Sequence, residues 1–196
     1  MIQIYSATIT DVERCKKHEV EHAAGLRLLV QGLHELYGIT IGEKEIESKL
    51  RKGPHGKPEL IDYEGIHFNI SHTDGLVVCG FADAPIGVDV ELVAPVRPAL
   101  PKRVLTEEEL SYFLAFTPET DEYNYEFFRF WTLKESYMKW DGSGFAREPQ
   151  TISFTFSPEG EIVSSEEGLY FYQETIDHRY ILAVCSEKPA KINIQL

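Results

Sequence analysis

One short stretch, residues 85–92 (Pro-Ile-Gly-Val-Asp-Val-Glu-Leu), constrains the fold of this chain more than any other. Its aliphatic residues occupy every second position from 86 to 92, and this period of two, rich in β-branched side chains, predicts a strand with one buried face. The opposite face carries Asp89 and Glu91, roughly 6.5–7 Å apart at a rise of about 3.3 Å per residue. The two acids either decorate a solvated strand face or form part of a cation site.

The repulsion between these two carboxylates is the argument for the second interpretation, although the strand alone leaves both interpretations open. Like charges held side by side on a rigid strand are stabilised by a positive partner. Mg²⁺ takes oxygen ligands and is usually held by one or two carboxylates together with substrate phosphates, so it is the natural candidate, with Mn²⁺ as a substitute. A metal site that includes Asp89 and Glu91 is therefore one of two interpretations, and the rest of the chain has to decide between them.

The overall composition limits the classes of partner. The 196 residues, 43% hydrophobic and 12% aromatic, predict a folded chain of one domain or two small halves. The net charge of −13 disfavours nucleic acid and anionic membranes as general partners. Three scattered cysteines without a CxxC pair predict neither a disulfide framework nor a thiolate zinc site. No signal peptide or membrane span is recognisable, so we expect a cytoplasmic protein.

A second pattern, His18-Glu19-Val-Glu-His22, lies in a predicted helix that ends at Gly38. It matches the HExxH motif of zinc metallopeptidases, in which two histidines one turn apart bind zinc and the glutamate acts as base. A third ligand would have to come from elsewhere, for example from Glu43, Glu45 or Glu47. A motif with three fixed positions often occurs by chance, and a solvated helix face is the simpler interpretation.

Polar residues with ligand-binding potential precede the acidic strand. Lys57 lies between Gly56 and Pro58, a setting that suits either a turn or a cation directed at a phosphate. Ser71 and His72 end a predicted strand. Because neighbouring strand residues point to opposite faces, these two cannot form the hydrogen bond of a nucleophile–base pair. We interpret them as ligand contacts or as polar groups that stabilise the following turn.

Residues 126–140 predict a helix with an aromatic stripe that contains Glu135. A carboxylate within such a stripe is costly unless a cation accompanies it. Lys139, one turn later, forms a simple helix pair with Glu135 in one interpretation. In the other, Glu135 is a third acidic ligand or a base, and Lys134 and Lys139 meet phosphate charge.

Glu109 has a structural and a catalytic interpretation. Thr106 and Glu109 have the spacing of a capping box, in which the glutamate side chain returns to the N-cap backbone. Capping is therefore the first explanation of Glu109, and a role as a second general base is the alternative.

Four motifs in this order resemble the 4′-phosphopantetheinyl transferases of the Sfp-like (surfactin synthetase-activating) type. They are Gly56-Lys57-Pro58, Phe68-Asn-Ile-Ser71-His72, Gly87-Val-Asp89-Val-Glu91 and Trp131-Thr-Leu-Lys134-Glu135-Ser-Tyr-Met-Lys139. The resemblance covers residues 53–145, whereas the first fifty residues match in outline. In that first part, Arg27, Lys16 and Lys17 are the candidates for the basic residues that the family usually carries there.

The resemblance implies an α+β fold of two similar α/β halves related by a pseudo-twofold axis. Each half, residues 1–84 and residues 85–196, would be a helix packed on a small antiparallel sheet. Coenzyme A would bind in the cleft between the halves. Since this cleft lies within one chain, the resemblance also implies a monomer.

The implied reaction moves the phosphopantetheine arm of coenzyme A to a serine of an apo acyl or peptidyl carrier protein and releases adenosine 3′,5′-bisphosphate. By resemblance, Mg²⁺ would be held by Asp89, Glu91 and Glu135. Glu135 would be the base, with Glu109 second, and Lys139 would contact the reacting phosphate. The implied coenzyme A contacts are Lys57, Ser71, His72 (near the 3′-phosphate), Asp89, Lys134 and Lys139.

The sequence also offers candidate residues for docking a carrier protein, and it leaves two alternative functions open. Carrier docking would use apolar side chains after the capping box and basic residues such as Arg103 or Arg147, although core packing explains the apolar ones equally well. The candidates for those apolar contacts are Phe113, Leu114 and Phe116. A non-catalytic coenzyme A-binding or carrier-binding relative and, further off, a zinc peptidase built on His18, Glu19 and His22 are the alternative functions.

Overall fold

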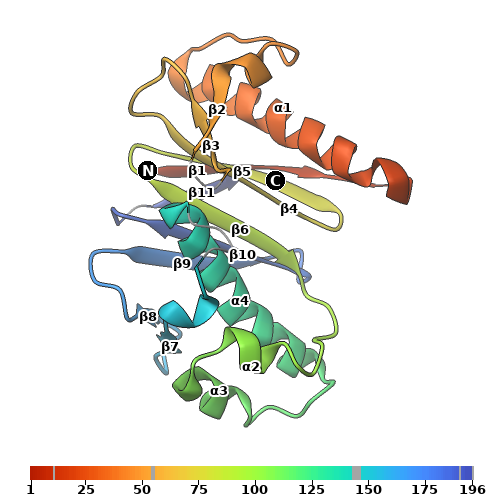
Figure 1. The fold of residues 1–196 in the computed structure, drawn as a ribbon, viewed down its shortest axis with the longest axis vertical. Coiled ribbons are helices and arrows are strands. Elements are labelled where there is room, and N and C mark those ends of the chain that lie inside the picture. The colour runs from red at the N-terminus through yellow and green to blue at the C-terminus, as the bar shows by residue number, and fades with distance from the viewer. Residues whose placement is uncertain (11, 54–55, 143–146, 190, 196) are drawn as a thin grey trace.

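Two long helices enclose two β-sheets in the computed structural model, which describes residues 1–10, 12–53, 56–142, 147–189 and 191–195 (Figure 1). The first helix, α1 (Lys17–Tyr37), follows a short 3-10 turn, η1 (Arg14–Lys16), and ends at Gly38 in the left-handed conformation, as predicted. The second, α4 (Asp121–Asp141), begins at the N-cap Thr120 and ends at Gly142, also left-handed. Both long helices thus end at a left-handed glycine, and α4 also begins at a capping threonine.

The sheet beneath α1 has four strands in the order β11-β1-β5-β4. They are β11 (Ile192–Gln195), β1 (Ile2–Thr8), β5 (Leu76–Ala82) and β4 (His67–Thr73). The hairpin β4–β5 and the pair β1–β5 are antiparallel, whereas β11 runs parallel to β1. A strand from the end of the chain therefore completes the sheet that the first residues begin.

The sheet that packs against α4 has three antiparallel strands in the order β6-β10-β9. They are β6 (Ile86–Leu92), β10 (Tyr180–Ser186) and β9 (Tyr170–Ile176). The predicted strand at residues 85–92 is confirmed as β6, although both of its faces are covered at Val88 and Asp89. A strand that is covered by another layer on both faces has no solvated face, so a period of two does not by itself tell which side is open.

The two sheets pack face to face and form the middle of the molecule. One apolar cluster joins them, with Ile4 and Val78 from the first sheet and Val88, Leu182 and Val184 from the second. Separate clusters lie between each sheet and its helix. The arrangement is therefore helix, sheet, sheet, helix, and the predicted α+β class is confirmed (Figure 1).

Shorter elements complete the fold. Between α1 and β4 lie η2 (Ile46–Lys49), β2 (Leu50–Lys52) and β3 (Pro58–Leu60). The segments α2 (Pro101–Val104) and α3 (Glu107–Phe113) precede α4, and η4 (Pro149–Thr151), β7 (Phe154–Phe156) and β8 (Ile162–Ser164) follow it. Among the described residues, no helix combines the length and the apolar character needed to cross a membrane.

Gly87 sets the distance between α4 and β6. A Cβ atom at this position would lie 1.9 Å from the carbonyl oxygen of Ser136 and 2.3 Å from the backbone nitrogen of Trp140. Only glycine permits this approach of helix backbone to strand backbone. It brings the residues that follow Ser136 on α4 next to Asp89 on β6.

Candidate functional site

The edge strands β4 and β6 are joined by side chains rather than by a backbone ladder. Three side-chain oxygens of β4 accept hydrogen bonds from three backbone N–H groups of β6, at 2.8–3.2 Å. The pairs are Asn69 with Val88, Ser71 with Val90, and Thr73 with Leu92. This seam satisfies the exposed edge of β6 and fixes the register between the two sheets.

Asp89 lies on this seam and is almost fully buried, with 2% of its surface exposed. Its Oδ1 atom accepts a hydrogen bond from Ser71 Oγ at 3.2 Å and forms an ion pair with Lys139 Nζ at 2.6 Å. Lys139 Nζ also donates to Ser71 Oγ at 2.8 Å. Strand β4, strand β6 and helix α4 therefore meet at one charged cluster, and Lys139 supplies its cation.

Glu91 lies two residues further along β6. Its two oxygens accept hydrogen bonds from Trp131 Nε1 at 3.1 Å and from Thr73 Oγ1 at 3.2 Å. Burial and the neighbouring Asp89 raise the pKa of Glu91, and the hydrogen bonds from Trp131 and Thr73 oppose that rise. The carboxylate is thus held in place by groups from both β4 and α4.

Glu135 brings a third carboxyl group to the same cluster. It is 8% exposed, and burial, followed by repulsion from Asp89, raises its pKa to about 7 despite the opposing effect of Lys139. Within the described residues, Glu135 Oε1 and Asp89 Oδ2 are buried without a hydrogen-bond partner. Buried acceptors usually have partners, so each of these two oxygens has the capacity to accept a further donor or a cation.

The described part of the chain contains no three His, Cys, Asp or Glu side chains already arranged to hold a metal ion. At Asp89 the adjacent positive charge is instead Lys139. The two unpartnered carboxylate oxygens nevertheless fit a hard cation, which takes oxygen ligands. At the HExxH motif, His22 Nε2 lies 2.9 Å from Glu47, but no third ligand joins them in the described residues, so the zinc alternative gains no support.

Ser71 and His72 point to opposite faces of β4, as predicted. Ser71 contacts the acidic cluster, whereas His72 faces α1 and places Nδ1 3.2 Å from Oε2 of Glu21. Glu21 is a residue that the sequence analysis did not select, because one acid in an acidic helix carries no distinguishing pattern.

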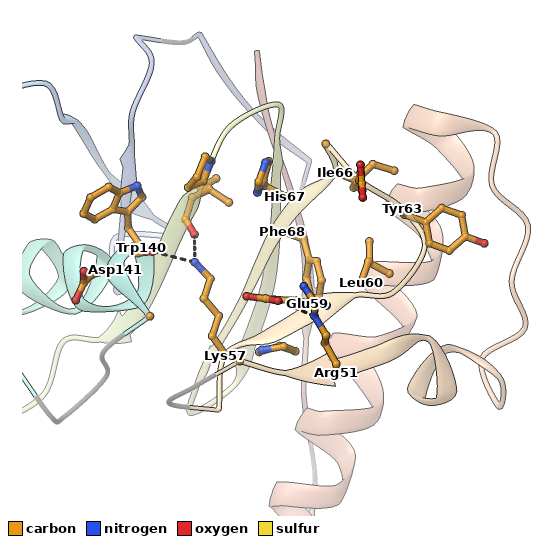
Figure 2. Close-up of a pocket in the computed structure, with 17 residues that line it drawn as sticks. Arg51, Lys57, Glu59, Leu60, Tyr63, Ile66, His67, Phe68, Trp140 and Asp141 are labelled. Carbon is orange, nitrogen blue, oxygen red and sulfur yellow. Dashed lines mark hydrogen bonds and ion pairs between the residues drawn. The ribbon is translucent and has the colours of Figure 1, made fainter.

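Lys57 bridges the segment before β3 and the end of α4. Its Nζ atom donates to the carbonyl oxygens of Ile86 at 2.9 Å and Trp140 at 3.1 Å (Figure 2). Burial lowers the pKa of Lys57. The stem of this lysine lines two neighbouring cavities, one of about 670 Å³ that includes Tyr63 and Phe68, and one of about 220 Å³ that reaches Lys139.

Glu109 and Lys134 lie elsewhere, in a buried ion pair of 2.8 Å in which both side chains are 0% exposed. Lys134 also donates to the carbonyl oxygens of Pro149 and Ile152. The capping box of Thr106 and Glu109 is confirmed. None of the recorded polar contacts of Glu109 or Lys134 reaches β4 or β6, so the structure does not bring these two residues to the cluster and favours the structural interpretation of both.

Thr73 and Asn69 are site residues that the sequence analysis missed. Their signal was present, because polar side chains at 69, 71 and 73 repeat with the period of a strand. That period does not reveal that the facing strand lacks a backbone ladder with β4.

The family model and the similar proteins found by comparison all carry the same family description. The model of the 4′-phosphopantetheinyl transferase superfamily matches residues 85–185. The 4′-phosphopantetheinyl transferase Sfp of Bacillus subtilis (strain 168) is 33% identical over 139 residues, which are 69% of this chain and 61% of that protein. The 4′-phosphopantetheinyl transferase psf-1 of Bacillus pumilus is 28% identical over 162 residues, 81% of this chain and 67% of the relative. The transferase HetI of Nostoc sp. is 31% identical over 137 residues, 67% of this chain and 55% of the relative. The chain thus spans 55–67% of the length of these three relatives.

Proposed function

Because the chain belongs to the 4′-phosphopantetheinyl transferase superfamily, we propose that it transfers the 4′-phosphopantetheine arm of coenzyme A to a serine of an apo acyl or peptidyl carrier protein and releases adenosine 3′,5′-bisphosphate. The observation that carries the proposal is the cluster of Asp89, Glu91, Glu135 and Lys139 at the junction of β4, β6 and α4. It combines three acids, which suit a divalent cation, with one lysine, which suits the negative charge of a phosphoryl group in transfer.

We further propose that the fold consists of two similar halves related by a pseudo-twofold axis, divided near residue 84. One long helix on one small sheet in each half supports this description. The parallel strand β11 is the exception, because it comes from the second half of the chain and pairs with β1. The cleft between the halves would bind coenzyme A.

The acids would hold the metal ion of the reaction. Asp89, Glu91 and Glu135 would bind Mg²⁺, or Mn²⁺ in its place, which would supply positive charge beside the pyrophosphate of coenzyme A. Ser71 and Thr73 keep Asp89 and Glu91 in position through hydrogen bonds of 3.2 Å. Lys139, 27% exposed at its side chain, would exchange part of its contact with Asp89 for the reacting phosphate.

Glu135 is the proposed general base. In the metal-free protein, burial and the neighbouring Asp89 raise the pKa of Glu135 to about 7, so without the cation this carboxyl group accepts a proton near neutral pH. It would take the proton of the carrier serine, directly or through water, while the serine oxygen forms its bond to the phosphorus that carries the pantetheine arm. The bond from that phosphorus to the bridging oxygen of the pyrophosphate breaks, and adenosine 3′,5′-bisphosphate leaves. Glu109 is not proposed as a second base, since its carboxylate is fully buried against Lys134.

The nucleotide contacts of the proposal lie along β4 and beside α4. Ser71 and His72 would contact the nucleotide, His72 near its 3′-phosphate. Lys57 lines the 220 Å³ cavity that also includes Lys139, so a ligand in this cavity would touch both lysines. Lys134 is left out of the ligand set because its ammonium group is enclosed by Glu109 and two carbonyl oxygens.

The carrier would dock near the end of α3. Leu114 is 67% exposed there, whereas Phe113 is fully buried and serves the core. Arg147 contacts Asp141 at 3.6 Å and is a basic residue available near the end of α4. A monomeric state is part of the proposal, and light scattering of the purified protein would test it.

The test is the intact mass of an apo carrier protein after incubation with this protein, coenzyme A and Mg²⁺. We expect a gain of one phosphopantetheine, lost with EDTA and in Asp89→Asn and Glu135→Gln. Glu122→Gln, an exposed acid in the first turn of α4, is the matched control and should behave as the unmodified protein. Coenzyme A binding without a mass gain on several unrelated carriers would favour the non-catalytic relative instead.

A further inference from the structure

Glu21 is a buried carboxylate that the proposed reaction does not use. It lies on α1, is 5% exposed, and its Oε2 atom is 3.2 Å from Nδ1 of His72. Its Oε1 atom is buried without a hydrogen-bond partner among the described residues, and Lys17 Nζ lies 3.8 Å away. Since a buried carboxylate is costly without compensation, the contacts with His72 and, at longer range, with Lys17 offset the burial of Glu21.

His72 is held by this contact while its ring remains open to a ligand. Its side chain is 45% exposed, and the ring lies edge-on to His18, with 6.5 Å between the ring centroids. The pKa of His72 is lowered, chiefly by burial; the carboxylate of Glu21 opposes that decrease and Lys139 adds to it. Ser71, the neighbour of His72 on β4, contacts Lys139 Nζ at 2.8 Å, so the ring lies at the margin of the same site.

The chemistry of an imidazole explains what Glu21 adds. A neutral ring that donates from Nδ1 to a carboxylate has an acceptor at Nε2, which repels a phosphate. A protonated ring donates from both nitrogens. A carboxylate on Nδ1 stabilises that charged form and fixes the direction of Nε2, as the outer partners of metal-bound histidines do.

The directions of the side chains on the two faces of β4 indicate which group of coenzyme A lies at His72. Ser71 and Lys139 lie on the face of β4 turned toward β6, where the proposed pyrophosphate binds. His72 points to the other face. Coenzyme A carries one anionic group apart from its pyrophosphate, the 3′-phosphate of the ribose.

We propose that Glu21 is a positioning residue that holds Nδ1 of His72 and thereby directs Nε2 at the 3′-phosphate of coenzyme A. The inference rests on the proposed function for the identity of the ligand. It assigns to Glu21 the discrimination between coenzyme A and 3′-dephospho-coenzyme A.

Calorimetric titration with these two ligands tests the proposal without requiring turnover. In Glu21→Gln, we expect coenzyme A to bind about tenfold more weakly, the size of losing one charge-assisted hydrogen bond. Binding of 3′-dephospho-coenzyme A should not change. In the transfer assay, KM for coenzyme A should rise with kcat unchanged. Asp74→Asn is the matched control, because it removes an exposed carboxylate that pairs with Lys17 and makes no recorded contact with His72.

A double substitution separates positioning from a merely structural role. In a His72→Gln background, Glu21→Gln should cause no further loss of affinity for coenzyme A. Should Glu21→Gln fail to fold, Glu21→Asp takes its place, since a shorter carboxylate withdrawn from Nδ1 of His72 must weaken coenzyme A and spare the dephospho form. Equal losses for both ligands, additive effects of the two substitutions, or unchanged binding would each overturn the proposal. If the protein still distinguished coenzyme A from 3′-dephospho-coenzyme A but transferred nothing to a carrier protein, the result would instead count against the proposed function alone.

Discussion

Replacing Lys134 with methionine should make the protein less stable and leave the proposed reaction site unchanged. Lys134 Nζ lies 2.8 Å from Glu109 Oε2 and donates to the carbonyl oxygens of Ile152 at 2.6 Å and Pro149 at 3.0 Å. Methionine keeps the length and the apolar stem of the side chain but removes the ammonium group. The substitution leaves the Glu109 carboxylate buried without its cation.

The expected cost follows from this geometry. Breaking a buried ion pair by removing one partner costs about 3–5 kcal/mol, because the remaining charge is uncompensated. Glu109 still accepts hydrogen bonds from the backbone N–H groups of Phe154 at 2.7 Å and Thr106 at 2.8 Å. Because these donors partly compensate the carboxylate, we expect the loss of stability to stay within that range. For a chain of this size, each kcal/mol lowers Tm by roughly 2–4 °C, which gives a decrease of roughly 6–20 °C.

Circular dichroism during heating, together with urea denaturation, measures the effect. The double variant Lys134→Met/Glu109→Gln should recover a large part of the lost stability, since a neutral amide is less costly to bury than an unpaired carboxylate. Coenzyme A binding by the folded fraction of Lys134→Met should match that of the unmodified protein.

A specific result would refute this reasoning. If Lys134→Met kept its Tm within about 2 °C and lost coenzyme A binding, Lys134 would be a ligand contact. The predicted role of Lys134 at the phosphate would then stand, and the side chain would have to leave its buried position when coenzyme A binds.

Three further outcomes test the site. Gly87→Ala should cost about 3 kcal/mol or more in urea denaturation, because its Cβ would meet the backbone of α4, whereas Gly42→Ala, with open space around it, should be nearly neutral. Thr73→Val should cost about 1–3 kcal/mol by the same assay, because it leaves a partly buried N–H of β6 without its acceptor, and Thr73→Ser should restore most of the loss. In EDTA, the stability of the unmodified protein relative to Glu135→Gln should fall by about 3 kcal/mol as pH rises from about 4.5 to 7. The pKa of Glu135 is raised to about 7 in the folded state, so that state keeps a proton that the unfolded chain has released; a flat difference across this range would contradict the assignment.

The sequence was sufficient wherever the determining residues are close together along the chain. Alternation at residues 85–92 predicted β6, and the spacing of Thr106 and Glu109 predicted the capping box. Gly38 predicted the end of α1. Each of these features depends on interactions within a few residues, so the local pattern contains the necessary information.

The sequence also identified the acids and the family from the order of four motifs. Asp89, Glu91 and Glu135 were predicted to act together, and the structure brings them to one cluster around Lys139. Whether they bind Mg²⁺ stays a prediction, as do the predicted monomer and the cytoplasmic location.

Only the tertiary structure decided which lysine joins the acids. Lys134 and Lys139 both flank Glu135 in sequence and both looked suited to a phosphate. The packing of α4 encloses Lys134 with α3, η4 and β7, while the close approach at Gly87 turns Lys139 toward Asp89. The seam between β4 and β6 and the contact of Glu21 with His72 were likewise invisible in the sequence. Their partners are 18 to 51 residues apart, and the way helices and sheets stack, rather than any local spacing, determines whether such residues meet.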